Sequence, residues 1–264
     1  MDKKFVLGII GAGNMASAIV GGILSANILS PDKMIISDPD KEKLNCFAKK
    51  GMSVTSDNKF LSANCSYLLF AVKPQVAPIV WNDIKDDISA ETVISIMAGV
   101  SISKLCAALG ERNYARIMPN TPALVGEGMS AVAFSNGFRS QFVIDVFKSL
   151  GKVVELDESA FDAVTSLSGS GPAYVYMFIK SLIDGGMDGG LDFDTAKTLA
   201  IQTVKGSATM IENSNEDIGV LIDRVCSKGG TTIEAVNSFR EDGLEDIVRR
   251  GMKKCKNRSI ELGK

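Results

Sequence analysis

The residues with the clearest chemical potential form a glycine-rich loop near the start of the chain. Gly11, Gly13 and Ala16 make a G-x-G-x-x-A pattern that follows an apolar run and opens a helix-compatible stretch. The first glycine permits a tight turn, the second lets the backbone approach a pyrophosphate, and the small third residue lets the helix pack on the strand. A helix N-terminus there offers free N–H groups and a positive dipole end. The pattern predicts a dinucleotide site with contacts from Ile10, Gly11, Gly13, Asn14 and Met15.

The end of the next apolar run bears on which dinucleotide is bound. Asp38 lies where an acidic residue would accept a hydrogen bond from the ribose 2′-OH of NAD. Ser37, with Lys41 and Lys43, is instead a set that would hold the 2′-phosphate of NADP. The two lysines fit a solvated helix face equally well. These residues therefore leave the choice between NADPH and NADH open.

Further loops are expected at the same edge of the predicted sheet, because ligands of open α/β sheets bind at the carboxyl ends of the strands. A lysine followed by a proline ends one apolar run, and small residues that leave room for a flat nicotinamide ring end the next. An exposed charge at a strand end is the alternative interpretation of that lysine. The cofactor-binding candidates in these loops are Ala71, Val72, Lys73, Pro74, Met97, Ala98 and Gly99.

A second candidate site lies in the last third of the chain. Gly229-Gly230-Thr231-Thr232 precedes a helix-compatible run. Consecutive glycines expose backbone N–H groups and the helix start adds its dipole, so the segment is suited to a small carboxylate. A plain helix N-cap made by a threonine is the structural alternative.

The composition excludes several classes of function. The 264 residues contain no histidine, so His-based triads, His zinc ligands and an imidazole base are ruled out. The five cysteines are scattered without a C-x-x-C motif, which predicts thiols in a reducing compartment and no metal site. A net charge of −2 gives no sign of nucleic-acid binding. No apolar run reaches the roughly 20 residues of a membrane span, and we expect a cytoplasmic protein.

The pattern of apolar runs predicts an α/β domain over residues 1–158. Short runs rich in Val, Ile and Phe fit strands buried on both faces of a sheet, and the stretches between the first five are long enough for helical crossovers. The last two runs lie close together and would add antiparallel strands at one edge. The predicted strands are residues 5–10, 34–37, 67–72, 92–96, 115–118, 129–134 and 152–156.

Residues 159–264 are predicted to form an all-helical domain. Val175, Phe178, Ile179 and Leu182 recur at helical spacing, and a second stripe begins at Ala196, after Asp192 and Asp194 as candidate caps. The tail over 233–262 is also helix-compatible. The helix over 173–182 is apolar on most sides and must be buried. We therefore expect a second copy of the chain to cover it.

Several blocks, spread over nearly the whole chain, resemble the pyrroline-5-carboxylate reductases. They are IGAGNMASAI from residue 10, AVKPQ from 71, SIMAGVS from 95, RIMPNTPALVGEG from 116, SLSGSGPAYVY from 166, GGTTIEAV from 229 and NRSIEL from 257. The first block is shared with many dehydrogenases, whereas the later four, in this order, are quite specific. The small residues of SLSGSGPAY also fit close packing at the start of a helix.

The resemblance implies a Rossmann-type dinucleotide-binding domain and an all-α C-terminal domain that interlocks into a homodimer, which often assembles further. It implies reduction of 1-pyrroline-5-carboxylate to L-proline, the last step of proline biosynthesis, with NADPH or alternatively NADH. Asn58 joins the cofactor residues. Lys228 stands where the family usually has proline. Thr232 is assigned as hydrogen-bond partner of the ring nitrogen, and the substrate-binding residues are Glu158, Ser227, Gly229, Gly230, Thr231 and Thr232.

Two other functions fit part of the sequence. The first is a reductase of the same shape that acts on a β-hydroxy acid or a different cyclic imine. Many such dehydrogenases use a lysine early in the second domain as acid or base, and Lys180 is the candidate. A non-catalytic dinucleotide-binding module would need an added recognition element such as a basic helix-turn-helix, which the sequence lacks.

Overall fold

The computed structural model describes residues 3–263, and its internal contacts divide them into two compact units. The first unit runs to Ser170 and takes in the end of the chain from Cys255, and the second comprises Gly171–Lys254. The division lies beyond the change of sequence pattern at residue 158, because the segment after it stays with the sheet. Phe161 is buried against Ala131 and Ala133 of the sheet.

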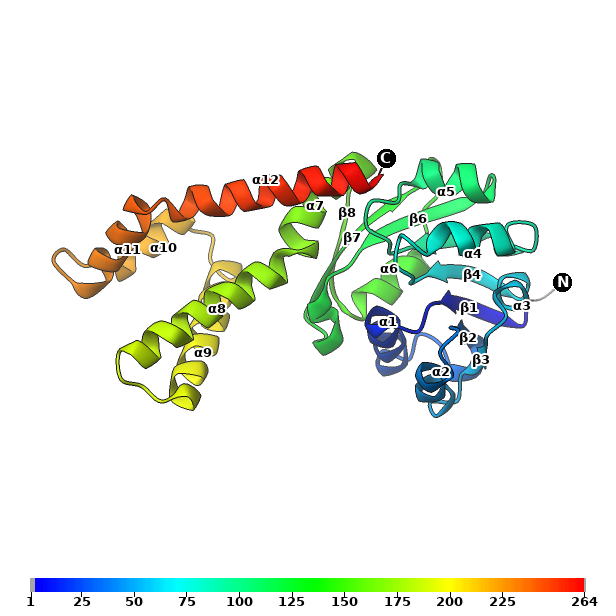
Figure 1. The fold of residues 1–264 in the computed structure, drawn as a ribbon, viewed down its shortest axis with the longest axis horizontal. Helices are drawn as coiled ribbons and strands as arrows, with labels where there is room; N and C mark the ends of the chain where they lie inside the picture. Colours follow the sequence, from blue (N-terminus) through cyan, green and yellow to red (C-terminus); the bar gives the residue numbers. More distant parts are fainter. Residues whose placement is uncertain (1–2, 264) are drawn as a thin grey trace. The chain divides into compact units, whose positions relative to one another are not determined.

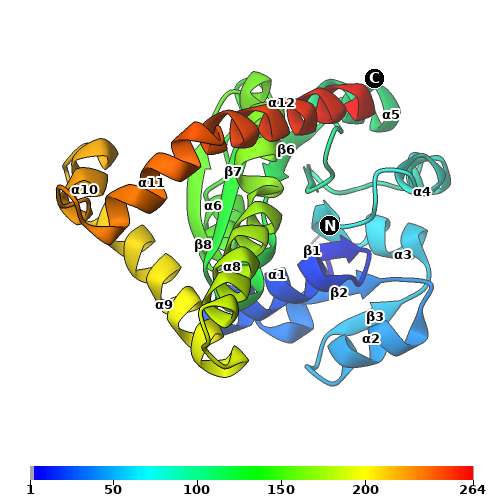
Figure 2. The same ribbon diagram turned by 60° about the vertical axis from the view of Figure 1, so that its left-hand side comes forward.

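The first unit is built on one eight-stranded sheet with the strand order β3-β2-β1-β4-β5-β6-β7-β8 (Figures 1 and 2). The strands from β3 to β6 are parallel, β7 runs antiparallel to β6, and β8 is parallel to β7. This confirms the doubly wound class and the two reversed strands at one edge. The strands are β1 (Phe5–Ile10), β2 (Met34–Ser37), β3 (Ser53–Thr55), β4 (Cys65–Phe70), β5 (Thr92–Ser95), β6 (Asn113–Met118), β7 (Gly128–Phe134) and β8 (Gly151–Glu155).

Helices cover both faces of this sheet, which explains why its strands are apolar throughout. One core joins the sheet to α1, α2 and α6, and the other joins it to α3, α4 and α5. Polar caps begin several of these helices. Asp40 caps α2, and the amides of Lys43 and Glu42 hold the pKa of its carboxyl below its usual value. The helices are α1 (Asn14–Ser25), α2 (Lys41–Ala48), α3 (Asn58–Ala63), α4 (Ala77–Ile84), α5 (Ile102–Leu109), α6 (Gln141–Lys148) and α7 (Phe161–Val164).

The second unit consists of helices, as the sequence predicts. Asp192 caps α9 by accepting from the Thr195 amide at 2.9 Å, whereas Asp194 lies inside the first turn. The helix-compatible tail is two helices, because Gly243 adopts a φ of +72° between them. Helix α12 continues into the first unit. These helices are α8 (Gly171–Asp188), α9 (Phe193–Glu212), α10 (Ile218–Val225), α11 (Thr231–Glu241) and α12 (Leu244–Gly263).

The second unit has almost no apolar core of its own. Among its described residues only Ala196 and Ala200 are buried hydrophobic side chains. On α8, Tyr176 is 60% exposed and Met177 is 70% exposed. Large contiguous apolar surfaces of this kind mark interaction sites. Between residues 3 and 263, no helix has both the length and the apolar character of a membrane span.

Candidate active site

The parallel strands bring most of the predicted cofactor residues to one edge of the sheet. Ile10 ends β1, Ser37 ends β2, and Asn58 begins the helix after β3. The segments 71–74 and 97–99 follow β4 and β5. Since these five strands are parallel neighbours, the residues that follow them share the carboxyl edge, where open α/β sheets bind ligands.

Gly11 makes the tight turn at this edge. Its φ is +103°, and a Cβ atom there would lie 2.7 Å from the carbonyl oxygen of Ala71. Its amide donates to the Ser37 carbonyl at 2.8 Å, and the Ala71 amide donates to the Ile10 carbonyl at 2.8 Å. The loop is therefore bonded to both neighbouring strands, and only glycine fits its first position.

Gly13 is small for a different reason. It is the N-cap of α1 and makes no side-chain cap hydrogen bond. No described atom lies within 4 Å of the place where its Cβ would be. Packing within the chain therefore does not explain this glycine, whereas open space above uncapped amides fits a pyrophosphate.

Asp38 and Ser37 use their polar groups within the site. The Asp38 carboxylate accepts from the amide of Ala12 at 2.8 Å and from the amide of Asp40 at 2.9 Å. The Ser37 hydroxyl is buried and donates to Asn58 Oδ1. A buried hydroxyl that is already bonded is poorly placed for a 2′-phosphate. The Asp38 carboxylate, in contrast, lies directly against the glycine-rich loop, because it is bonded to the Ala12 amide.

The charged residues near this edge are more exposed. Lys43 lies 3.6 Å from the Asp40 carboxylate, an ion pair on the surface of α2. Lys73 is exposed, and its carbonyl accepts from the Val76 amide in a turn after β4.

In the segment that follows β5, Met97 is buried and Gly99 adopts a φ of +72°. Of the segment 97–99, only Ala98 is partly exposed, so this alanine and the adjoining backbone are the part that a ligand could reach.

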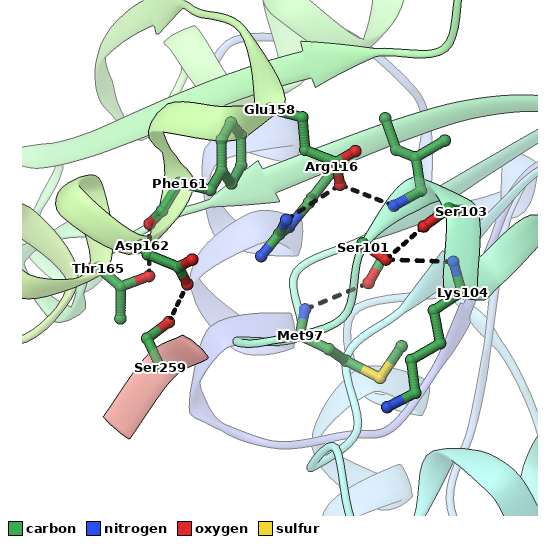
Figure 3. A network of polar contacts seen from close by, with 12 residues as sticks. Met97, Ser101, Ser103, Lys104, Arg116, Glu158, Phe161, Asp162, Thr165 and Ser259 are labelled. Carbon is green, nitrogen blue, oxygen red and sulfur yellow. Dashed lines mark hydrogen bonds and ion pairs between the residues drawn. The ribbon is translucent and has the colours of Figure 1, made fainter. Parts of the chain in front are cut away.

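Glu158 lies in a partly buried ionic network (Figure 3). Its Oε1 accepts from Arg116 Nη1 at 2.9 Å and from the Ile102 amide at 2.7 Å. The guanidinium also lies 4.8 Å from the ring centroid of Phe161. Glu158 thus ties β6 to the start of α5, and its contact with substrate stays a prediction. The feature of the sequence that could have revealed this ion pair is Arg116, a charged residue inside an apolar strand.

The proposed carboxylate site lies in the turn between α10 and α11, within the second unit. Gly229 has a φ of +69°, and the Gly230 amide donates to the Ser227 carbonyl at 3.0 Å. Gly230 is the N-cap of α11, with no side-chain cap, and Thr231 and Thr232 are the first helical residues. A threonine cap is therefore not observed. The first amides of α11 are left for an anion.

Lys180, the candidate of the β-hydroxy acid alternative, pairs with Asp184 one turn further along α8 at 2.5 Å. Its side chain is 75% exposed in the single chain. This is an ordinary i,i+4 helix pair. The geometry gives no support to Lys180 as an acid or base.

The SLSGSGPAY segment has a packing role. Its first residues belong to a turn of π-helix over Thr165–Gly169, which leads into α8. A Cβ on Gly169 would overlap the Met118 side chain. The Asn120 amide donates to the Ser168 carbonyl at 3.3 Å. Packing against β6 and the loop after it thus involves Ser168 and Gly169, whereas no described atom lies within 4 Å of the Cβ position of Gly171.

The cysteines are single thiols, and within residues 3–263 no three potential ligands are grouped for a metal ion. Cys65 is buried in β4, and burial raises the pKa of its thiol to about 12. It therefore stays protonated and unreactive at neutral pH.

The comparisons with known proteins agree along the full chain. Residues 158–262 match the family model described as pyrroline-5-carboxylate reductase dimerisation, and residues 6–99 match that of NADP oxidoreductase, coenzyme F420-dependent. The pyrroline-5-carboxylate reductase of Escherichia coli K12 is 36% identical over 100% of both chains. That of Arabidopsis thaliana is 35% identical over 98% of this chain and 96% of its own.

Solved structures show the same relationship. The Plasmodium falciparum pyrroline carboxylate reductase, crystallised with NADP bound, is 35% identical with a TM-score of 0.91 and full coverage of both chains. An Aspergillus terreus reductive aminase, at 16% identity and a TM-score of 0.64 over 98% of this chain and 95% of its own, shares the fold alone. The chain therefore belongs to the pyrroline-5-carboxylate reductase family.

Proposed function

We propose that this protein reduces the C=N bond of 1-pyrroline-5-carboxylate to L-proline, the last step of proline biosynthesis, with a hydride from NADPH. The observation that carries the proposal is a full-length match to relatives of that name, in a chain whose glycine-rich loop lies at the carboxyl edge of the sheet. We favour NADPH over NADH as the cofactor because the Plasmodium relative was crystallised with NADP bound. NADH is the alternative. We expect the enzyme to act in the cytoplasm.

The residues at the sheet edge fit the dinucleotide. Uncapped amides at the start of α1 and the open space above Gly13 suit the pyrophosphate. Asp38 and Asn58 are proposed to hold the adenosine ribose, and the segment 97–99 is proposed to hold the nicotinamide. When bound, the reduced nicotinamide supplies the hydride, so the task of the protein is alignment.

The substrate is a small anion with a cyclic imine. The free amides at the start of α11 are proposed to hold its carboxylate, and the Thr232 hydroxyl is proposed to hydrogen-bond the ring nitrogen. A ring nitrogen that is already protonated is a better hydride acceptor, so a strong general acid is unnecessary. The absence of histidine therefore poses no difficulty.

The helical unit is proposed to form a homodimer, and such dimers are proposed to assemble further. Most apolar side chains of this unit are exposed, and only the small side chains of Ala196 and Ala200 are buried. The unit therefore has no hydrophobic core unless another chain covers its apolar surface. The match to a dimerisation model over 158–262 supports a second copy as that chain.

A substitution on α8 tests this interface. Met177→Arg places a charge on a side chain that is 70% exposed in the single chain, and it should convert the dimer to monomer in light scattering. Ile79→Arg on α4 is the matched control, because Ile79 is 73% exposed but lies in the dinucleotide unit. A Met177→Arg protein that stays dimeric would contradict the proposed interface.

Replacing Asp38 tests which residue selects the cofactor. Asp38→Asn removes a negative charge beside the glycine-rich loop, so the NADPH/NADH ratio of kcat/KM should rise about 5- to 10-fold. Because altered hydrogen bonds to the loop would lower kcat/KM with both cofactors, this loss cancels in the NADPH/NADH ratio. Asp40→Asn is the control, since Asp40 caps α2 and pairs with Lys43. An unchanged ratio would remove Asp38 from cofactor selection.

The activity itself is tested by following oxidation of NADPH and of NADH with three substrates in parallel. They are 1-pyrroline-5-carboxylate, a six-membered cyclic imine carboxylate and a β-keto acid. We expect fast oxidation with the first only. Turnover of the β-keto acid without turnover of the imine would mean that the dinucleotide site is right and the substrate is wrong.

A further inference from the structure

The loop that follows β5 is backed by the last turn of α12. A Cβ on Gly99 would lie 3.1 Å from Leu262 Cβ and 3.3 Å from the Gly263 nitrogen. A Cβ on Gly263 would lie 3.1 Å from the Gly99 carbonyl oxygen. The two glycines thus let the end of the chain approach the backbone of this loop closely. This loop is the one proposed above to hold the nicotinamide.

A partly buried hydrogen bond fixes that end of α12 to the sheet unit. Ser259 is 4% exposed, and its hydroxyl donates to the Asp162 carboxylate at 2.6 Å (Figure 3). Asp162 lies on α7 next to Phe161, which is buried against β7. The bond joins residues 97 positions apart in the sequence. It therefore anchors the helix end to a rigid part of the fold.

The loop has empty space behind it. A cavity of about 230 Å³ is lined by the loop, by Arg116 of β6, by α7 and by the end of α12. The start of α5, where the loop ends, is held by the bond from the Ile102 amide to Glu158. On the opposite side, Met97 and Val100 of the loop are buried in the core that includes α4 and α5. On the cavity side, the loop is supported by the contact of Gly99 with the end of α12.

We propose that the Ser259–Asp162 hydrogen bond is a latch that positions the 97–101 loop for the nicotinamide half of the dinucleotide. Ser259 is a positioning residue, since it acts through the loop. The inference rests on the dinucleotide part of the proposed function and not on the imine substrate.

Binding of two nucleotides to the whole protein tests the latch. In Ser259→Ala the Kd for NADPH should rise at least about fivefold, while the Kd for 2′,5′-ADP, which lacks the nicotinamide half, should stay within about twofold of wild type. Ser259→Thr should restore NADPH binding, because it keeps the hydroxyl and the adjoining cavity accepts a methyl group. A general loss of folding would weaken both ligands together.

The control is Glu261→Gln, which breaks the exposed pair of Glu261 with Arg258 (2.8 Å) on the same helix end and should leave both Kd values unchanged. Gly263→Ala, which places a Cβ 3.1 Å from the Gly99 carbonyl oxygen but keeps the hydrogen bond, should disturb the same contact and reproduce the selective loss of NADPH binding. Unchanged NADPH affinity in Ser259→Ala, or equal weakening of both nucleotides, would overturn the latch. Both ligands are measured without imine, so a protein that fails to reduce pyrroline-5-carboxylate would refute the proposed activity and leave this result intact.

Discussion

Replacing Thr232 with alanine is expected to lower kcat/KM for the imine by about 10- to 150-fold, because one hydrogen bond to a charged partner contributes about 1.5–3 kcal/mol. Thr232 is the second residue of α11, directly after the two glycines of the proposed carboxylate site. Because the protonated ring nitrogen has no lone pair, the Thr232 oxygen would accept its N–H and orient the C=N bond for the hydride, so the loss should appear in kcat as well as in KM. Thr232→Ser keeps the hydroxyl and should retain most of the activity.

The matched control is Thr198→Ala on α9, where the hydroxyl donates to the Asp194 carbonyl of its own helix. Both substitutions remove the same atoms from an α-helix, so a loss seen only at Thr232 would be specific to the reaction. If kcat/KM of Thr232→Ala stays within about twofold of wild type, Thr232 has no part in the mechanism.

Gly11→Val is expected to weaken NADPH binding by at least about 100-fold. A side chain at this position meets two obstacles, a φ of +103° and the carbonyl oxygen of Ala71 at 2.7 Å from its Cβ. The strained conformation alone costs about 1–3 kcal/mol. The loop must therefore move away from β4, and the amides at the start of α1 move with it. The Kd for NADPH and the thermal midpoint of unfolding both measure the change.

Gly21→Ala in the same region provides the control. Gly21 lies within α1, and no described atom outside the local helix backbone lies within 4 Å of its Cβ position. Alanine there should leave binding unchanged and raise stability by roughly 0.5–1 kcal/mol, because alanine favours the helix. A Gly11→Val protein that binds NADPH as tightly as Gly21→Ala would contradict the role of the turn.

The sequence predicted the parts of the site that depend on local patterns. Gly11 and Gly13 follow an uninterrupted apolar strand, so the position and direction of the loop could be inferred from the pattern alone. Strand β3 was missed because Ser53–Thr55 is a short edge strand with one apolar residue, Val54, which is 38% exposed. Nothing in its composition separates it from a loop.

Other features depend on residues that are distant in the sequence. The pair of Arg116 with Glu158 spans 42 positions, and the contact of Ser259 with Asp162 spans 97. No periodicity of the sequence and no motif spacing predicts that such distant residues are in contact. Family resemblance placed Glu158 near the substrate, whereas the structure gives its carboxylate two partners within the dinucleotide unit. A charge within an apolar strand, such as Arg116, is the sequence signal that should prompt a search for a buried partner.

The most direct test of the proposed reaction follows the hydride itself. The protein is incubated with 1-pyrroline-5-carboxylate and NADPH in which both hydrogens at C4 of the nicotinamide are deuterium, and the product is analysed by mass spectrometry and NMR. We predict L-proline with a single deuterium at C5, formed in a one-to-one ratio with NADP⁺. Oxidation of the nucleotide without labelled proline, or no reaction with either NADPH or NADH, would contradict the proposed function.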